Sequence, residues 1–106
     1  MVRADLPDIL RQFRKGLEEI YGDRLVKVIL YGSQARGDAR PDSDVDVLVV
    51  LRLPGTDEEA DRVAGVEAEL CIEHGVLIAT MAVTQEKFER QEEPLYLNVQ
   101  LEGVSV

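Results

Sequence analysis

The run YGSQARGDARPDSDVDVLVV, residues 31–50, connects two segments with the character of buried strands. The first segment, Leu25 to Tyr31, is apolar and mostly β-branched, which predicts a strand. The second, Asp44 to Leu51, alternates at first and then becomes apolar on both faces, which is typical of a central strand. Residues 34–42 between them are polar and contain Gly and Pro, so they predict a loop with at most one helical turn.

An amphipathic helix is predicted on the N-terminal side of these strands, from Asp5 to about Tyr21. Its apolar residues recur at spacings of three and four: Leu6, Ile9, Leu10, Phe13, Leu17 and Ile20. Asp5 is a suitable N-cap, and Pro7 lies in the first turn, where its missing N–H costs nothing. Gly22 is a suitable stop.

A second helix is predicted from Thr56 to about Glu73, because Thr56 and Glu59 have the spacing of a capping box and Gly75 can end the helix. The residues expected to face inward are Ala60, Val63, Ala64, Leu70 and Cys71. Cys71 is interpreted as a small core residue, as free cysteines usually are.

The C-terminal third predicts a strand from Val76 to Val83 and a short helix from Thr84 to about Arg90. The apolar residues from Leu95 to Leu101 leave helix and strand both open. The order of elements predicts an α/β (α+β) fold, a small mixed β-sheet with helices packed against it. The length fits a single domain over residues 1–106.

The composition excludes several classes of protein. Twelve basic and 21 acidic residues give a net charge of −9, so direct nucleic-acid binding is not expected. No apolar run approaches a membrane span and no signal peptide is evident, which predicts a cytoplasmic protein without membrane contact. One cysteine and one histidine make an internal disulfide impossible and a zinc site of these residues untenable.

Asp44 and Asp46 are the first candidates for chemistry. Residues two apart in a strand point to the same face, so their carboxylates are expected to stand side by side. Mutual repulsion favours a divalent cation between them, and Mg²⁺ suits oxygen ligands and phosphates. The alternative is a solvated strand end, with these acids paired to Arg36 or Arg40. A calcium loop starting at Asp42 is excluded, because its sixth and twelfth positions lack the required Gly and Glu.

Gly32 and Ser33 are candidates for phosphate binding, since a glycine directly after a strand lets the backbone approach an anion closely. A P-loop is excluded because no lysine follows at the required spacing. A dinucleotide-binding fingerprint is excluded too, because Gly32 and Gly37 do not make G-x-G-x-x-G. Taken alone, Gly-Ser is simply a turn.

Together, Gly32-Ser33, ten intervening residues and Asp44-x-Asp46 resemble the signature of the DNA polymerase β-like nucleotidyltransferase superfamily. Tyr31 to Asp38 and Ser43 to Val50 are similar to its minimal nucleotidyltransferase branch. The resemblance implies that Asp44 and Asp46 are catalytic and bind two Mg²⁺ ions. The residues that it implies for binding ATP or another nucleoside triphosphate are Gly32, Ser33, Arg36 and Gly37.

The resemblance also implies a function: transfer of a nucleoside monophosphate to a hydroxyl, with release of pyrophosphate. Minimal nucleotidyltransferases are often the antitoxin half of a module whose toxin is a helical HEPN protein, and some adenylylate a tyrosine of that toxin. We therefore expect an adenylyltransferase with a HEPN-type partner.

One departure from the family leaves a second function open. Fully equipped members carry a third carboxylate on the strand beside the D-x-D strand, whereas the segment from Val76 to Val83 contains no acid. Leu77 is the best candidate for that position, and Glu73 is interpreted as a solvated residue at a helix end. Without the third acid, the chain could be a catalytically weak nucleotide-binding module that neutralises a partner by contact.

Overall fold

The computed structural model describes residues 4–37, 44–91 and 93–106. Their four-stranded sheet has the order β3-β2-β1-β4, with β1 spanning Leu25–Tyr31, β2 Val45–Leu51, β3 Ile78–Thr84 and β4 Val104–Ser105. β1 pairs antiparallel with β2 and with β4, while β2 and β3 are parallel. The sheet is therefore mixed, and β2 is central in it, as predicted.

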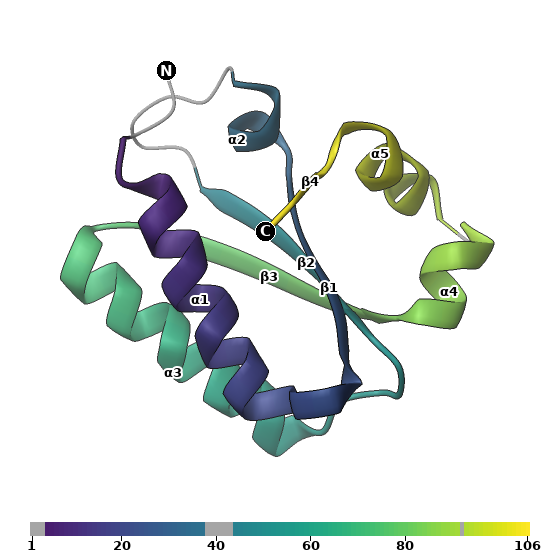
Figure 1. The fold of residues 1–106 in the computed structure, drawn as a ribbon, viewed down its shortest axis with the longest axis horizontal. Helices are drawn as coiled ribbons and strands as arrows, with labels where there is room; N and C mark the ends of the chain where they lie inside the picture. Colours follow the sequence, from purple (N-terminus) through teal and green to yellow (C-terminus); the bar gives the residue numbers. More distant parts are fainter. Residues whose placement is uncertain (1–3, 38–43, 92) are drawn as a thin grey trace.

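Two long helices cover one face of the sheet. α1 (Leu6–Tyr21) and α3 (Asp57–His74) lie side by side in Figure 1, and a short 3₁₀ turn, η1 (Gly22–Arg24), joins α1 to β1. Gly16 allows the two helices to approach closely, because a Cβ there would lie 3.0 Å from Val66 of α3. The core between helices and sheet includes the predicted apolar stripe of α1 and the odd-numbered side chains of β2: Val45, Val47, Val49 and Leu51.

Two shorter helices pack on the opposite face. α4 (Gln85–Arg90) and α5 (Pro94–Glu102) supply Phe88, Tyr96 and Val99, which are buried against β1, β2 and β3. The Phe88 and Tyr96 rings meet edge to face, with centroids 6.2 Å apart. Because β2 buries its odd-numbered side chains under α1 and α3, its even-numbered side chains lie on the α4/α5 face.

Most predicted elements are confirmed, with shifts of one or two residues at their ends. Thr56 and Glu59 form the predicted capping box, and Gly75 ends α3 in the left-handed conformation. Asp5 occupies the N-cap position of α1 without a capping hydrogen bond from its side chain. The predicted helical turn after β1 is α2 (Ser33–Arg36). The rest of that predicted loop, with Arg40 and Asp42, lies outside the described residues.

The predicted inward face of α3 is partly wrong. Val63 and Leu70 are buried, but Ala60 and Ala64 are exposed, and Cys71 is only half-buried. The reason is geometric: α1 lies on one side of α3, so the apolar face turns toward α1 and its far edge reaches solvent.

The C-terminal segment resolves the alternative that the sequence left open. Residues from Pro94 onward form a helix, because Pro94 begins it and Tyr96 and Val99 reach the core from adjacent turns. The tail then forms β4, which was not predicted and which pairs with Ile29 and Leu30 of β1. Among the described residues, no helix is both long and apolar enough to cross a membrane.

Candidate functional site

The turn that leaves β1 brings Gly32 against Asp46. Gly32 has φ +76°, a conformation that favours glycine, and a Cβ at this position would lie 2.6 Å from Asp46 Oδ2. α2 follows directly, with the Arg36 N–H bonded to the Gly32 carbonyl, and ends at Gly37 in the left-handed conformation. Gly32 and Gly37 therefore allow the one-turn helix α2 to follow β1 directly. The Asp46 carboxylate lies against the backbone of Gly32.

Asp46 lies on the α4/α5 face of the sheet, between two neighbouring strands. Its direct partners are Tyr31 on β1 and Ala79 on β3. The Asp46 side chain is half-buried, whereas Asp44, just before β2, is exposed. Tyr31 therefore flanks the carboxylate on one side, and the small Ala79 leaves the other side open.

The electrostatics of the pair follow from this geometry. Burial raises the pKa of Asp46 above its ordinary value, the charge of Asp44 raises it further, and Arg36 acts in the opposite direction. Burial and then the charge of Asp46 raise the pKa of the Tyr31 hydroxyl, which keeps it protonated. A positive charge at Asp46 would relieve both effects, because each reflects the cost of negative charge at this place.

These residues fit a divalent cation. Two carboxylates lie close enough to raise each other's energy, and one of them, Asp46, is half-buried and accepts no hydrogen bond from the described residues. The absence of a Cβ at Gly32 leaves room beside Asp46 Oδ2. Such a donor set provides part of an oxygen shell and leaves positions for water and phosphate, the arrangement that Mg²⁺ favours.

A third acidic ligand is absent from the described part of the chain. No group of three carboxylate, histidine or cysteine side chains comes together in residues 4–37, 44–91 and 93–106. Leu77 precedes β3, and its carbonyl accepts a hydrogen bond of 2.8 Å from Val45 N–H, so it lies alongside the Asp44-to-Asp46 segment. Its side chain is exposed.

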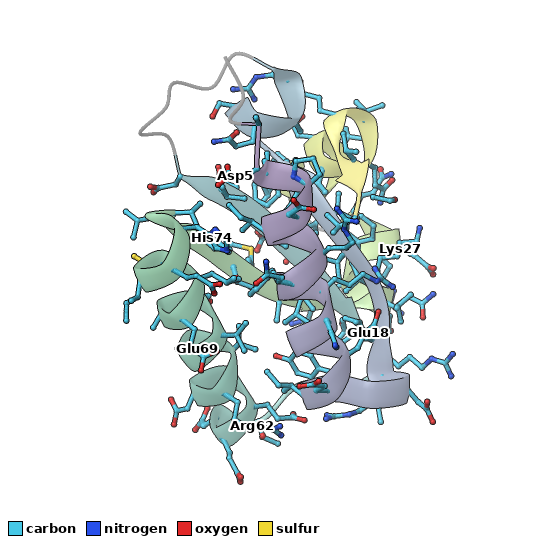
Figure 2. The ribbon with its side chains drawn as sticks, turned by 60° about the vertical axis from the view of Figure 1, so that its left-hand side comes forward. Asp5, Glu18, Lys27, Arg62, Glu69 and His74 are labelled. Carbon is cyan, nitrogen blue, oxygen red and sulfur yellow. The ribbon has the colours of Figure 1, made fainter. Side chains whose placement is uncertain are left out.

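Glu73 and His74 lie at the end of α3. The Glu73 side chain is 64% exposed, and its carboxylate is 3.9 Å from His74 Nε2. His74 Nδ1 lies 4.0 Å from Asp5 Oδ2, across the gap between α3 and the start of α1 (Figure 2). These contacts tie the two helix ends together and do not involve the Asp44/Asp46 pair.

The C-terminal segment supplies residues that the sequence did not single out. Arg36 Nη1 lies 3.6 Å from Glu102 Oε2, so the last residue of α5 pairs with the last residue of α2. Gly103 fixes this corner, because a Cβ there would lie 2.4 Å from both Ile29 Cγ2 and the Val99 carbonyl oxygen. Nothing in the local sequence predicts a contact between segments so far apart. The one available signal is Glu102-Gly103, an acid and a glycine at the end of an apolar run, which indicates a turn.

The chain matches a known family over most of its length. The model described as Nucleotidyltransferase domain matches residues 10–102. Two proteins of Methanocaldococcus jannaschii, each named "Putative protein adenylyltransferase", are 33% identical to this chain over 75 and 82 residues. These matches cover 71% and 77% of this chain and 76% and 77% of the two relatives.

Solved structures share the fold. One described as the structure of a "putative minimal nucleotidyltransferase" is similar with a TM-score of 0.63 and 28% identity, over 98% of both chains. A crystal structure of a toxin–antitoxin with AMP-PNP has a TM-score of 0.60 and 15% identity. That match covers 90% of this chain and 69% of the other, and at this identity the likeness concerns the fold alone.

Proposed function

Because the chain belongs to the nucleotidyltransferase domain family, we propose that it transfers AMP from ATP to a hydroxyl group of a partner protein. The observation that carries the proposal is the contact between Gly32 and Asp46, which joins the end of one strand to the acidic start of the next. The names of the two archaeal relatives, protein adenylyltransferases, support the same reaction and acceptor class.

Each residue of the candidate site has a separate proposed role. Asp44 and Asp46 would hold Mg²⁺, which supplies the charge that neutralises the triphosphate and favours the acceptor oxygen as a nucleophile. Gly32 and Ser33 would hold the β- and γ-phosphates with backbone N–H groups and a hydroxyl. Arg36 would contact phosphate, and Gly37 would permit the turn after it. The acceptor hydroxyl loses its proton to solvent, and its oxygen forms a bond to the α-phosphorus while the bond to the leaving pyrophosphate breaks.

We further infer that the acceptor belongs to a toxin of which this chain is the antitoxin. Two structurally similar chains come from toxin–antitoxin crystals, one with AMP-PNP and one of a mutant of the MntA-HpeT toxin–antitoxin. The helical HEPN-type partner implied by the sequence resemblance fits that setting. ATP or another nucleoside triphosphate is the second ligand.

The test is label transfer. The purified chain, Mg²⁺, ATP labelled at the α-phosphate and the protein encoded by the adjacent gene should give a labelled partner. Asp44→Asn and Asp46→Asn should abolish the label. Asp23→Asn serves as control, because Asp23 lies in η1, at the end of β1 away from Gly32. Transfer that survives both Asn variants would show that these carboxylates do not carry the reaction.

A second function is favoured by one observation, the absence of a third acidic ligand among the described residues. The chain could bind nucleotide weakly and neutralise its partner by contact. Stable complex formation without label transfer, unaffected by the Asn variants, would favour this binding module over the enzyme.

A further inference from the structure

β3 is an open edge of the sheet. It pairs with β2 on one side, and no strand among the described residues pairs with it on the other. Its seven residues, IATMAVT, contain no charge and no proline, and Met81 is 41% exposed. Natural edge strands are usually protected by charge, proline or a bulge, so an unprotected edge of this length favours pairing with another strand.

The direction of the backbone groups on this edge follows from the hydrogen bonds to β2. Val45 N–H donates to the Leu77 carbonyl, and Val45 is directly opposite Ile78 in the parallel register. The odd-numbered residues of this segment therefore bond to β2. The even-numbered residues Ile78, Thr80 and Ala82 direct their N–H and C=O groups toward the open edge.

Charge makes this edge suitable for a second copy of the same chain. The eleven residues Gly75 to Gln85 form the longest run of the sequence without an acidic or basic side chain. Elsewhere, a net charge of −9 opposes self-association. Two copies that meet along this run bring no charged side chains of β3 into opposition, and like charges directly opposite are what destabilises a strand pair. The carboxylate of the half-buried Glu67 in α3 interacts with Thr80, so one acidic group of each copy does lie beside this edge.

The helix α3 lies beside the same edge. Val66 of α3 packs against α1, so the opposite flank of α3 faces away from α1, on the outer side of the helix pair in Figure 1. By helical periodicity that flank carries the small side chains Ala60, Ala64 and Ala68 together with the acidic Asp57 and Asp61. By the same periodicity Arg62 and Glu69, which are labelled on α3 in Figure 2, lie on another side of the helix. Small residues let two helices approach closely.

We propose that two copies of this chain form a two-fold dimer through antiparallel pairing of β3, with their α3 helices adjacent across the axis. A pairing centred on Met81 sets Thr80 opposite Ala82 of the second copy and Ile78 opposite Thr84. The contact is isologous, as two-fold symmetry requires. Because β3 also lies beside Asp46, the interface begins one strand away from the candidate metal site.

Sedimentation equilibrium of the full chain tests the dimer. The expected mass at micromolar concentrations is twice the 11.8 kDa of the monomer. Ala82→Pro removes an N–H that faces the edge and leaves the ladder to β2 intact, so it should weaken the dimer at least about tenfold. Ala82→Ser keeps the N–H and should not. Higher salt should strengthen association by screening the acidic surfaces.

A second measurement does not depend on how Ala82→Pro folds. In a Cys71→Ser background, Met81→Cys should form an intermolecular disulfide on mild oxidation, because opposed residues at the axis lie within disulfide reach. Leu97→Cys on α5 is the matched control, since Leu97 and Met81 are 42% and 41% exposed. A monomer at all concentrations overturns the proposal, as does equal cross-linking of both variants. The proposal is also overturned if Ala82→Pro leaves self-association unchanged and impairs only the binding of a different protein.

Discussion

Replacing Asp46 with asparagine should stabilise the protein when no divalent cation is present. The folded state raises the pKa of Asp46, first through burial and then through Asp44. At neutral pH the ionised carboxylate therefore opposes folding. Asparagine keeps the size and removes the charge, so the variant should be more stable than the unmodified chain although it loses a proposed metal ligand.

The magnitude follows from the spacing of the two acids. Residues two apart in a strand are separated by about 6.6 Å. Two unit charges at that separation repel by about 2.5 kcal/mol at an effective dielectric of 20 and by about 0.6 kcal/mol in water. Asp44 is exposed and Asp46 is half-buried, so a value near 1 kcal/mol is appropriate. For a domain of this size, that corresponds to a rise in Tm of about 4–8 °C.

The direction of the Asp46 pKa shift also determines how stability depends on pH. Because the pKa of Asp46 is higher in the folded state, this group favours folding below its unfolded-state pKa. That contribution is lost as the pH rises through the folded-state pKa. The difference in Tm between Asp46→Asn and the unmodified chain should therefore be close to zero in acid, grow through the folded-state pKa, and be constant at neutral pH.

Thermal unfolding followed by circular dichroism, with EDTA or with Mg²⁺, measures both effects. Mg²⁺ should raise the Tm of the unmodified chain at neutral pH and leave that of Asp46→Asn almost unchanged, because a cation stabilises the state that binds it. Asp23→Asn should respond to Mg²⁺ like the unmodified chain. If Asp46→Asn lowers the Tm in EDTA, or if the difference does not vary with pH, the electrostatic reasoning is refuted.

Three further predictions concern single positions. Gly32→Ala should cost about 1–3 kcal/mol of unfolding free energy. Gly37→Ala, also at positive φ but with open space around it, should cost about 1 kcal/mol; equal losses in urea unfolding would contradict the proposed close approach. Gly103→Ala should destabilise strongly, because two contacts at 2.4 Å cannot both yield, whereas Gly65→Ala in the open middle of α3 should stabilise by about 0.5–1 kcal/mol. Leu77→Asp should raise the rate of label transfer if the site lacks a third carboxylate beside Asp44 and Asp46. An unchanged rate would show that a carboxylate at position 77 is not what limits the reaction.

Local patterns predicted most of the fold because, in the most regular elements, the pattern of apolar residues matches the faces that are buried. β2 is apolar on both faces because helices cover both, and its central position could be predicted from Leu48 to Leu51 alone. α5 could not be assigned, since its apolar residues follow neither period clearly: Tyr96 and Val99 are buried, yet Leu97 and Leu101 are exposed. Only packing against the sheet decides for helix there.

The candidate site likewise contains residues that local sequence brings together and residues that only the tertiary fold brings together. Strand periodicity predicted that Asp44 and Asp46 lie on one face, and the resemblance to the family signature is what connected them to Gly32 and Ser33. Glu102 could not, because its approach to Arg36 requires α5 and β4 to fold back onto β1. A carboxylate this close to the proposed phosphate-binding turn would oppose a polyanion and would also orient the Arg36 guanidinium. In the proposed function, nucleotide affinity should therefore depend on the C-terminal segment as well as on the motif, and truncation of that segment should alter binding even with every motif residue intact.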